Sequence, residues 1–122
     1  MDTQSRDSFS CTVVVTTYNS AKTLRRTLNS ILNQSPIKAE NVIVIDDASN
    51  DESVRIAGEY PFTVIVNEVN IGSGAAKATG LSYVNTEYVA FLDADDAWDP
   101  NFLQLQKQMW KENKDAGAIG LS

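Results

Sequence analysis

Two groups of aspartates stand where apolar stretches of the sequence end. Asp46 and Asp47 follow the run NVIVI, and Asp93, Asp95 and Asp96 follow YVAFL. Like charges about 5 Å apart repel by roughly 3 kcal/mol at an effective dielectric near 20, so the carboxylates need compensation. A hard divalent cation such as Mg²⁺ or Mn²⁺ accepts oxygen ligands of this kind and usually keeps positions open for water or phosphate. The pattern therefore predicts a site where a cation arrives together with a polar ligand.

Four short apolar runs, rich in Val, Ile and aromatic residues, would carry these aspartates. They span 11–15, 41–45, 62–66 and 88–92, and a helical pattern follows each of them. Nearly continuous apolar character is typical of parallel strands that are covered on both faces. The alternation predicts an α/β fold that is Rossmann-like and doubly wound, with a mainly parallel sheet and helices on both faces.

Some helix boundaries and faces can also be predicted. Ser49 with Glu52 matches a capping box that would open the second helix. The third helix is expected over 72–84. The fourth is expected to turn Phe102, Leu105 and Met109 toward the core.

Loops after the carboxyl ends of parallel strands lie together, and ligands bind in that crevice. The candidate ligand-binding residues are Thr16, Tyr18, Asn19, Asp46, Asp47, Asn70, Gly72, Lys77, Asp93 and Asp95. Gly72 precedes a helix whose N-terminal N–H groups could meet an anion, and Lys77 is one turn further on. A structural reading stays open, since a single aspartate after a strand is usually a turn or cap residue.

Composition excludes several classes of function. The net charge is −6 and the pI about 4.4, which argues against nucleic acid or an anionic membrane as the main partner. The chain has no histidine, which excludes Ser-His and Cys-His nucleophiles and His-ligated zinc. Its one cysteine, Cys11, excludes an internal disulfide and favours a reducing, cytoplasmic location. No signal peptide or membrane-spanning stretch is predicted.

Five motifs in order resemble the N-terminal half of an inverting family 2 glycosyltransferase with the GT-A fold. They are VVVTTYN, NSILNQ, VIVIDDASND, NIGSGAAKATG and YVAFLDADDAWDPNFL, and they span Cys11 to Leu103. The resemblance implies a nucleotide-sugar donor, most often UDP-linked, and Mn²⁺ or Mg²⁺ as cofactor. It also implies transfer with inversion to an acceptor that the sequence does not identify: a sugar, a lipid or a protein.

The resemblance assigns the base-binding side of the site to residues from three strand ends. Thr16 and Tyr18 would flank the base, with Tyr18 stacking on it. Asp47, together with Asp46, would accept hydrogen bonds from the base or ribose. Lys77 stands where the family usually has arginine, which keeps the charge but loses the planar fork.

The resemblance assigns the diphosphate side to the aspartates after the fourth strand. Asp93 would hold ribose hydroxyls, and Asp95 would bind the metal that bridges the diphosphate. Asp93 and Asp96 are further candidate metal ligands. The base that deprotonates the acceptor is expected downstream, so no catalytic residue is assigned within these 122 residues.

The predicted organisation is a disordered or extended segment over 1–10 and the nucleotide-sugar-binding half over 11–122. The closing AGAIGLS looks like the start of a fifth strand, so we expect the acceptor-binding half to be absent and the fragment to bind donor only. Membrane contact is then expected only through the missing part. Two alternatives stay open: a nucleotidyltransferase, although TTYNSAKT lacks the usual glycine-rich basic loop, and a non-catalytic metal- or nucleotide-binding α/β module.

Overall fold

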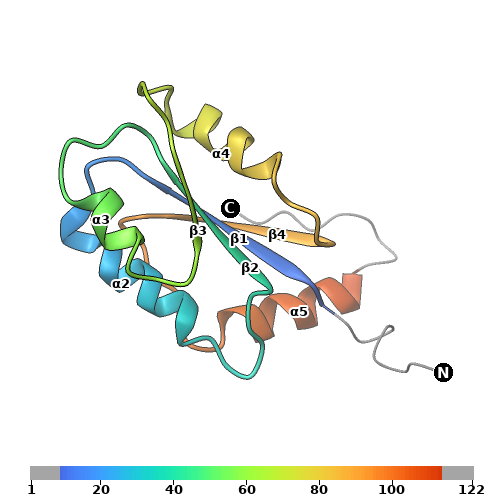
Figure 1. Cartoon of the computed structure of the whole chain (residues 1–122). Helices are drawn as coiled ribbons and strands as arrows, with labels where there is room; N and C mark the ends of the chain where they lie inside the picture. The colour runs from blue at the N-terminus through green and yellow to red at the C-terminus, as the bar shows by residue number, and fades with distance from the viewer. Residues whose placement is uncertain (1–8, 114–122) are drawn as a thin grey trace.

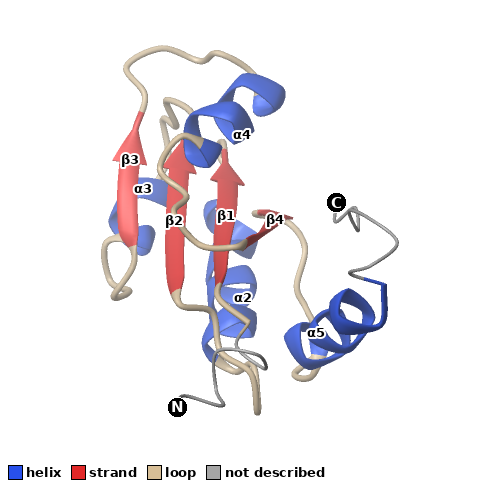
Figure 2. Cartoon of the chain, turned by 90° about the vertical axis from the view of Figure 1, so that its right-hand side faces the viewer, coloured by secondary structure: helices blue, strands red, loops and turns tan. Residues whose placement is uncertain are grey.

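The structure is a computed structural model, and it describes residues 9–113. Four parallel strands form one sheet in the order β3-β2-β1-β4 (Figure 1). The strands are β1 (Cys11–Thr17), β2 (Asn41–Asp46), β3 (Thr63–Val66) and β4 (Tyr88–Asp93). Every pair of neighbours runs parallel. The strand ends therefore lie at one edge of the sheet, where the arrowheads of β1, β2 and β3 point the same way in Figure 2.

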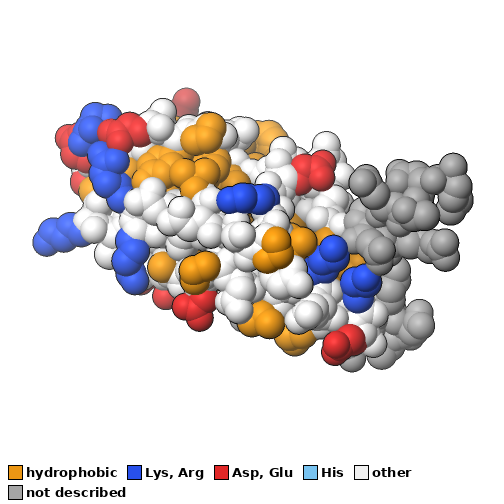
Figure 3. Space-filling view, turned by 90° about the horizontal axis from the view of Figure 1, so that it is seen from below, with side chains coloured by type: hydrophobic (Ala, Val, Ile, Leu, Met, Phe, Trp, Pro, Cys, Tyr) orange, Lys and Arg blue, Asp and Glu red, His pale blue; other side chains and the backbone are white. Residues whose placement is uncertain are grey.

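A helix follows each strand, and the helices pack on both faces of the sheet. The helices are α2 (Ala21–Leu32), α3 (Ser53–Ala57), α4 (Ser73–Leu81) and α5 (Phe102–Asn113). Helix α4 lies on one face, and α2, α3 and α5 lie on the other (Figure 1). On the side seen in Figure 3, lysine and arginine side chains are spread among hydrophobic and uncharged ones. The predicted doubly wound α/β fold is confirmed.

The alternation of side chains along β1 divides the core into two layers. Val13 and Val15 join the larger cluster with Leu24 and Leu28 of α2. Val14 points the other way and joins a smaller cluster under α4. Because successive side chains of a strand alternate between faces, one apolar run can serve both layers.

Helix α4 approaches the sheet closely at Gly80. A Cβ atom at this position would lie 2.4 Å from Val14 Cγ1 and 3.3 Å from Ile45 Cγ1. Gly80 is buried, as is Ala76 one turn earlier. Small residues therefore let α4 lie directly on β1 and β2, which brings its N-terminus to the carboxyl edge of the sheet.

The predicted capping box at the second helix is wrong. Helix α3 begins at Ser53, and its N-cap is Glu52, which makes no side-chain cap hydrogen bond. Ser49 instead donates its hydroxyl proton to Asp46 Oδ1 at 2.7 Å. In a capping box the serine oxygen would accept from a backbone N–H of its own helix, but Ser49 Oγ accepts from the backbone N–H of Asn19 at 2.8 Å.

The predicted inward face of the fourth helix is only partly correct, because Phe102 packs against the larger core cluster but Leu105 and Met109 do not. Leu105 and Met109 are each 47% exposed, whereas Leu103 is fully buried. The backbone N–H of Leu103 donates to Gln34 Oε1 at 2.9 Å, and this contact fixes the rotation of α5 at its first turn.

The two chain ends are described only in part. Of the predicted N-terminal segment, Phe9 and Ser10 are described, and the Phe9 ring centroid lies 4.9 Å from that of Tyr88. Residues 1–8 and the predicted fifth strand at 116–122 lie outside the described residues. Within 9–113, no helix is long and apolar enough to cross a membrane.

Replacing Gly80 with alanine should destabilise the fold by about 1–3 kcal/mol, because the new Cβ would overlap Val14. The matched control is Gly74→Ala in the same helix, where a Cβ would meet nothing within 4 Å. That control should be neutral or gain up to about 1 kcal/mol, because alanine is the better helix former. Urea denaturation of both variants measures the difference, and equal effects would contradict the close approach.

Candidate functional site

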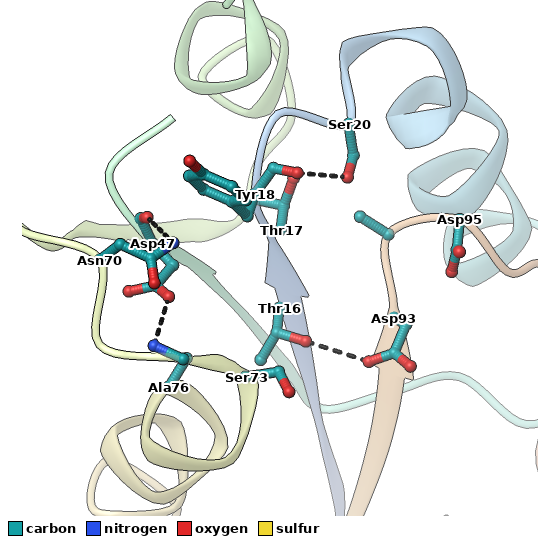
Figure 4. Close-up of a pocket in the computed structure, with 12 residues that line it drawn as sticks. Thr16, Thr17, Tyr18, Ser20, Asp47, Asn70, Ser73, Ala76, Asp93 and Asp95 are labelled. Atoms are coloured by element: carbon teal, nitrogen blue, oxygen red, sulfur yellow. Dashed lines mark hydrogen bonds between the residues drawn. The ribbon is translucent and has the colours of Figure 1, made fainter. Parts of the chain in front are cut away.

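A pocket of about 460 Å³ opens at the carboxyl ends of β1, β2 and β4, beside the first turn of α4 (Figure 4). Its walls are formed by Thr16, Thr17, Tyr18, Ser20, Asp47, Asn70, Gly72, Ser73, Ala76, Asp93, Ala94 and Asp95. Seven of the residues predicted from the sequence thus meet in one crevice. The structure brings these seven together, and their roles toward a ligand stay predictions.

Asp93 is held at the pocket wall by a neighbour in the sheet. The β1–β4 register sets Thr16 opposite Asp93, and Thr16 Oγ1 donates to Asp93 Oδ1 at 3.1 Å. Lys77 Nζ lies 3.9 Å from the same oxygen. The two side chains of this ion pair are 39% and 49% exposed, so the pair contributes little to stability and stays open to other partners.

Asp47 is nearly buried and joins β2 to the segment before α4. Its Oδ1 accepts hydrogen bonds from Asn67 Nδ2 at 3.0 Å and from the Ile71 backbone N–H at 2.9 Å. Its Oδ2 accepts from the backbone N–H of Gly72 at 2.9 Å. Burial alone would raise the pKa of Asp47, but the bonds from Ile71, Asn67 and Gly72 together outweigh it and lower the pKa below its ordinary value.

Asp46 and Asn19 lie outside the pocket wall and join two loops instead. Asp46 is fully buried, and its two carboxylate oxygens accept from the backbone N–H and the hydroxyl of Ser49. Asn19 has a φ of 48°, donates its backbone N–H to Ser49 Oγ at 2.8 Å and accepts from the backbone N–H of Asn50 at 2.7 Å. The structure therefore gives both residues a role in fixing the loops after β1 and β2.

Three exposed carboxylates gather after β4. Asp93, Asp95 and Asp96 each offer an oxygen, and these oxygens lie within 4.8 Å of one another. Across 9–113 they are the only group of this kind among His, Cys, Asp and Glu side chains. An all-oxygen set fits Mg²⁺ or Mn²⁺ by its chemistry, since softer metals favour sulfur or nitrogen ligands.

A second hollow of about 270 Å³ adjoins the pocket and shares Asp93 with it. Lys77 and Asp96, which do not line the main pocket, face this hollow. Phe91 and Trp98 are also in its wall. The two predicted residues thus lie next to the pocket, on the far side of Asp93.

Sequence reasoning missed several residues of the pocket wall. Thr17 is 3% exposed, and its hydroxyl has no hydrogen-bond partner in the part of the chain that is described. Ser20 Oγ donates to the carbonyl oxygen of Tyr18 at 3.0 Å, a contact drawn in Figure 4. Both stand in the polar stretch TTYNS after the first apolar run, which is the feature that indicated a binding site. Only Thr16, Tyr18 and Asn19 of this stretch were predicted to bind the ligand.

A parallel sheet that gathers acidic side chains in a crevice at its carboxyl edge defines a ligand-binding domain of the Rossmann-like α/β class. The chain belongs to glycosyltransferase family 2, because the model described as "Glycosyl transferase family 2" matches residues 12–122.

Named relatives agree with this assignment. The chain is 28% identical over 109 residues to the UDP-Glc:alpha-D-GlcNAc-diphosphoundecaprenol beta-1,3-glucosyltransferase WfgD of Escherichia coli, covering 88% of this chain and 43% of WfgD. It is 35% identical over 114 residues to the poly(ribitol-phosphate) beta-N-acetylglucosaminyltransferase TarP of Staphylococcus aureus, covering 88% of this chain and 35% of TarP. The chain therefore spans less than half the length of these relatives.

Solved structures confirm the GT-A fold. The crystal structure of S. aureus TarS 1-349 in complex with UDP has a TM-score of 0.80 and 31% identity, over 87% of this chain and 33% of TarS 1-349. The complex of the same protein with UDP-GlcNAc also has a TM-score of 0.80 and 31% identity, covering 87% of this chain and 32% of that one.

Changing Asp47 to asparagine should destabilise the protein by about 1–3 kcal/mol at pH 7, since an amide NH₂ would face one of three buried donors. The lowered pKa of Asp47 contributes stability that is present above about pH 4, the ordinary aspartate value, and lost as the pH falls through the lower folded value. The gap between wild type and variant should therefore shrink below about pH 4.

Denaturant titrations over this pH range measure the gap. The control is Asp99→Asn, which changes an exposed aspartate. A gap for Asp47→Asn that does not change with pH would contradict the assignment of its stabilising role to the carboxylate.

Proposed function

We propose that this chain binds a UDP-linked sugar donor in the pocket, together with Mg²⁺ or Mn²⁺, for transfer to an acceptor with inversion. The observation that carries the proposal is the convergence of Asp47, Asp93 and Asp95 on one crevice. The name of WfgD includes UDP-Glc, and TarS forms complexes with UDP and UDP-GlcNAc. These relatives support UDP as the nucleotide part.

The base and ribose are proposed to lie between Tyr18 and Asp47. Tyr18 is 48% exposed and lines the pocket, which leaves its ring available for stacking on a base. A carboxylate offers about four acceptor positions, and three of those on Asp47 are occupied by protein donors. Asp47 thus has one position left for a ligand N–H or O–H, and its low pKa keeps it ionised as an acceptor.

The diphosphate is proposed to lie beside the acidic cluster. Asp95 would hold the cation, with Asp93 and Asp96 as further ligands, and Asp93 would also accept from ribose hydroxyls. The cation would neutralise charge that develops on the departing diphosphate. Lys77, close to Asp93, would add a positive charge on the other side.

The acceptor's proton is proposed to go to a base outside residues 9–113. In this range the aspartates that line the pocket are Asp47, Asp93 and Asp95, and donor binding occupies each of them in the proposal. The part of the reaction assigned to this chain is therefore donor binding and stabilisation of the leaving group.

UDP with Mn²⁺ should raise the melting temperature of the chain, and Asp95→Ala should remove the metal-dependent part. At a hundredfold excess over Kd, ligand stabilises by about 2.7 kcal/mol, which is roughly 10 °C for a domain of this size. Thermal shift assays with UDP in Mn²⁺ or in EDTA measure both parts. The control is Asp99→Ala, an exposed aspartate outside the pocket wall.

Equal shifts in wild type and Asp95→Ala would contradict the metal assignment. A chain that shows no manganese-dependent affinity for UDP would instead favour the non-catalytic module.

A further inference from the structure

Helix α2 holds the acidic loop after β4 through the loop's backbone carbonyl oxygens. Thr23 Oγ1 donates to the carbonyl oxygen of Ala94 at 2.7 Å. Thr27 Oγ1 lies 2.8 Å from the same oxygen and 2.5 Å from the carbonyl oxygen of Asp96. The single hydroxyl proton of Thr27 therefore bridges the two ends of the turn 94–96.

Arg26 completes the set of contacts. Its Nη2 donates to the carbonyl oxygen of Asp95 at 2.8 Å. Positions 23, 26 and 27 are three and four residues apart, so they share one side of the helix. Each of three successive carbonyl groups in the acidic loop thus accepts from a side chain of α2.

Thr27 is an unusual residue type for its surroundings. It is fully buried, and Leu24, Leu28 and Ile31 of the same helix belong to the core. Valine would fill a similar volume without burying a hydroxyl, which is unfavourable unless the hydroxyl is hydrogen-bonded. The hydroxyl lies 3.3 Å from the carbonyl oxygen of Thr23 in its own helix, and its two shorter contacts are with the acidic loop.

The far end of the loop is held from just beyond the same helix. Gln34 is fully buried. Its Nε2 donates to the carbonyl oxygen of Asp99 at 2.6 Å, and its Oε1 accepts from the backbone N–H of Leu103. The segment between β4 and α5 is therefore attached at both ends.

The hydrogen bonds to the loop's backbone matter here because few other contacts hold the carboxylates of this loop in place. In the described part of the chain, the carboxylates of Asp95 and Asp96 accept no hydrogen bond, and both residues are exposed. Their oxygens lie close enough to repel each other and that of Asp93. The backbone between them must hold its conformation against this repulsion.

We infer that Thr27 is a positioning residue: acting through the carbonyls of Ala94 and Asp96, its hydroxyl sets the backbone geometry in which Asp95 and Asp96 receive a divalent cation. The inference rests on the proposed function. Partners that orient metal ligands without touching the metal typically change metal affinity 10- to 100-fold when they are removed. Thr23 supports the same carbonyl from the preceding turn of α2.

The test compares Thr27→Val, which removes the hydroxyl at constant shape, with Thr27→Ser, which keeps it. Thr12→Val is the matched control. Thr12 is also fully buried, and its Oγ1 lies 2.7 Å from Thr86 Oγ1, near the opposite end of β1 from the pocket. Each valine variant loses one buried hydroxyl and the single proton it donates, so their melting temperatures should fall by similar amounts.

Titration calorimetry of the full chain with UDP in MnCl₂ or in EDTA gives the first readout. Thr27→Val should weaken the manganese-dependent affinity by about tenfold or more and leave the affinity in EDTA unchanged. Thr27→Ser should restore most of the loss, and Thr12→Val should match wild type. Thr23→Val, at a half-buried position, should act in the same direction, and it replaces Thr27→Val if that variant does not fold.

Hydrogen–deuterium exchange of the ligand-free chain gives the second readout. The amides of 94–96 should exchange faster in Thr27→Val than in wild type, but not in Thr12→Val. Unchanged exchange, or equal losses of affinity in Thr27→Val and Thr12→Val, would overturn the inference and leave the proposed function standing. Wild type without manganese-dependent UDP affinity would overturn the proposed function and the cation part of the inference, and the exchange data would still decide whether Thr27 positions the loop.

Discussion

Repulsion between carboxylates is the constraint on which the site of this family 2 domain depends. The parallel sheet delivers aspartates from β2 and β4 to one edge, and the molecule handles them in two ways. Asp46 and Asp47 are buried and are satisfied by neutral hydrogen-bond donors from neighbouring loops. Asp93, Asp95 and Asp96 stay exposed, where water reduces their repulsion without removing it, and side chains of α2 hold the backbone of their loop. Asp46 bonds to Ser49, Asp47 keeps one acceptor position open toward the pocket, and the exposed group has capacity for a cation.

The donors that satisfy the buried carboxylates also assemble the site. Ser49 bonds to both Asp46 and Asn19, and it thereby links the loop after β2 to the loop after β1. The bonds from Asp47 to Ile71 and Gly72 hold the first turn of α4 at the pocket wall. Hydrogen bonds between these loops thus hold the side chains of Asp46 and Asp47 in their observed positions.

Part of the fold and of the site could be predicted from local patterns. The four apolar runs became strands with boundaries shifted by no more than two residues, since strand periodicity and burial are properties of short segments. The pairing of strands in parallel then fixed which loops meet, and Asp47 and Asp95 reached the same crevice as expected. The wrong predictions, at Ser49 and at Leu105, depend on contacts between distant parts of the chain: Ser49 Oγ accepts from Asn19, and Gln34 holds the first turn of α5.

The sequence by itself determined the order of strands and helices along the chain and the edge of the sheet at which the aspartates gather. It also determined the family. These properties follow from hydrophobic periodicity and from motifs within short stretches. Only the tertiary structure decided which aspartates face the pocket, for the difference between Asp46 and Asp47 lies in donors contributed by separate loops. It also decided the part played by Thr27, whose hydroxyl meets carbonyl groups about seventy residues away in the chain. A hydrogen bond depends on where two groups lie in space, and a linear pattern specifies only where each lies along the chain.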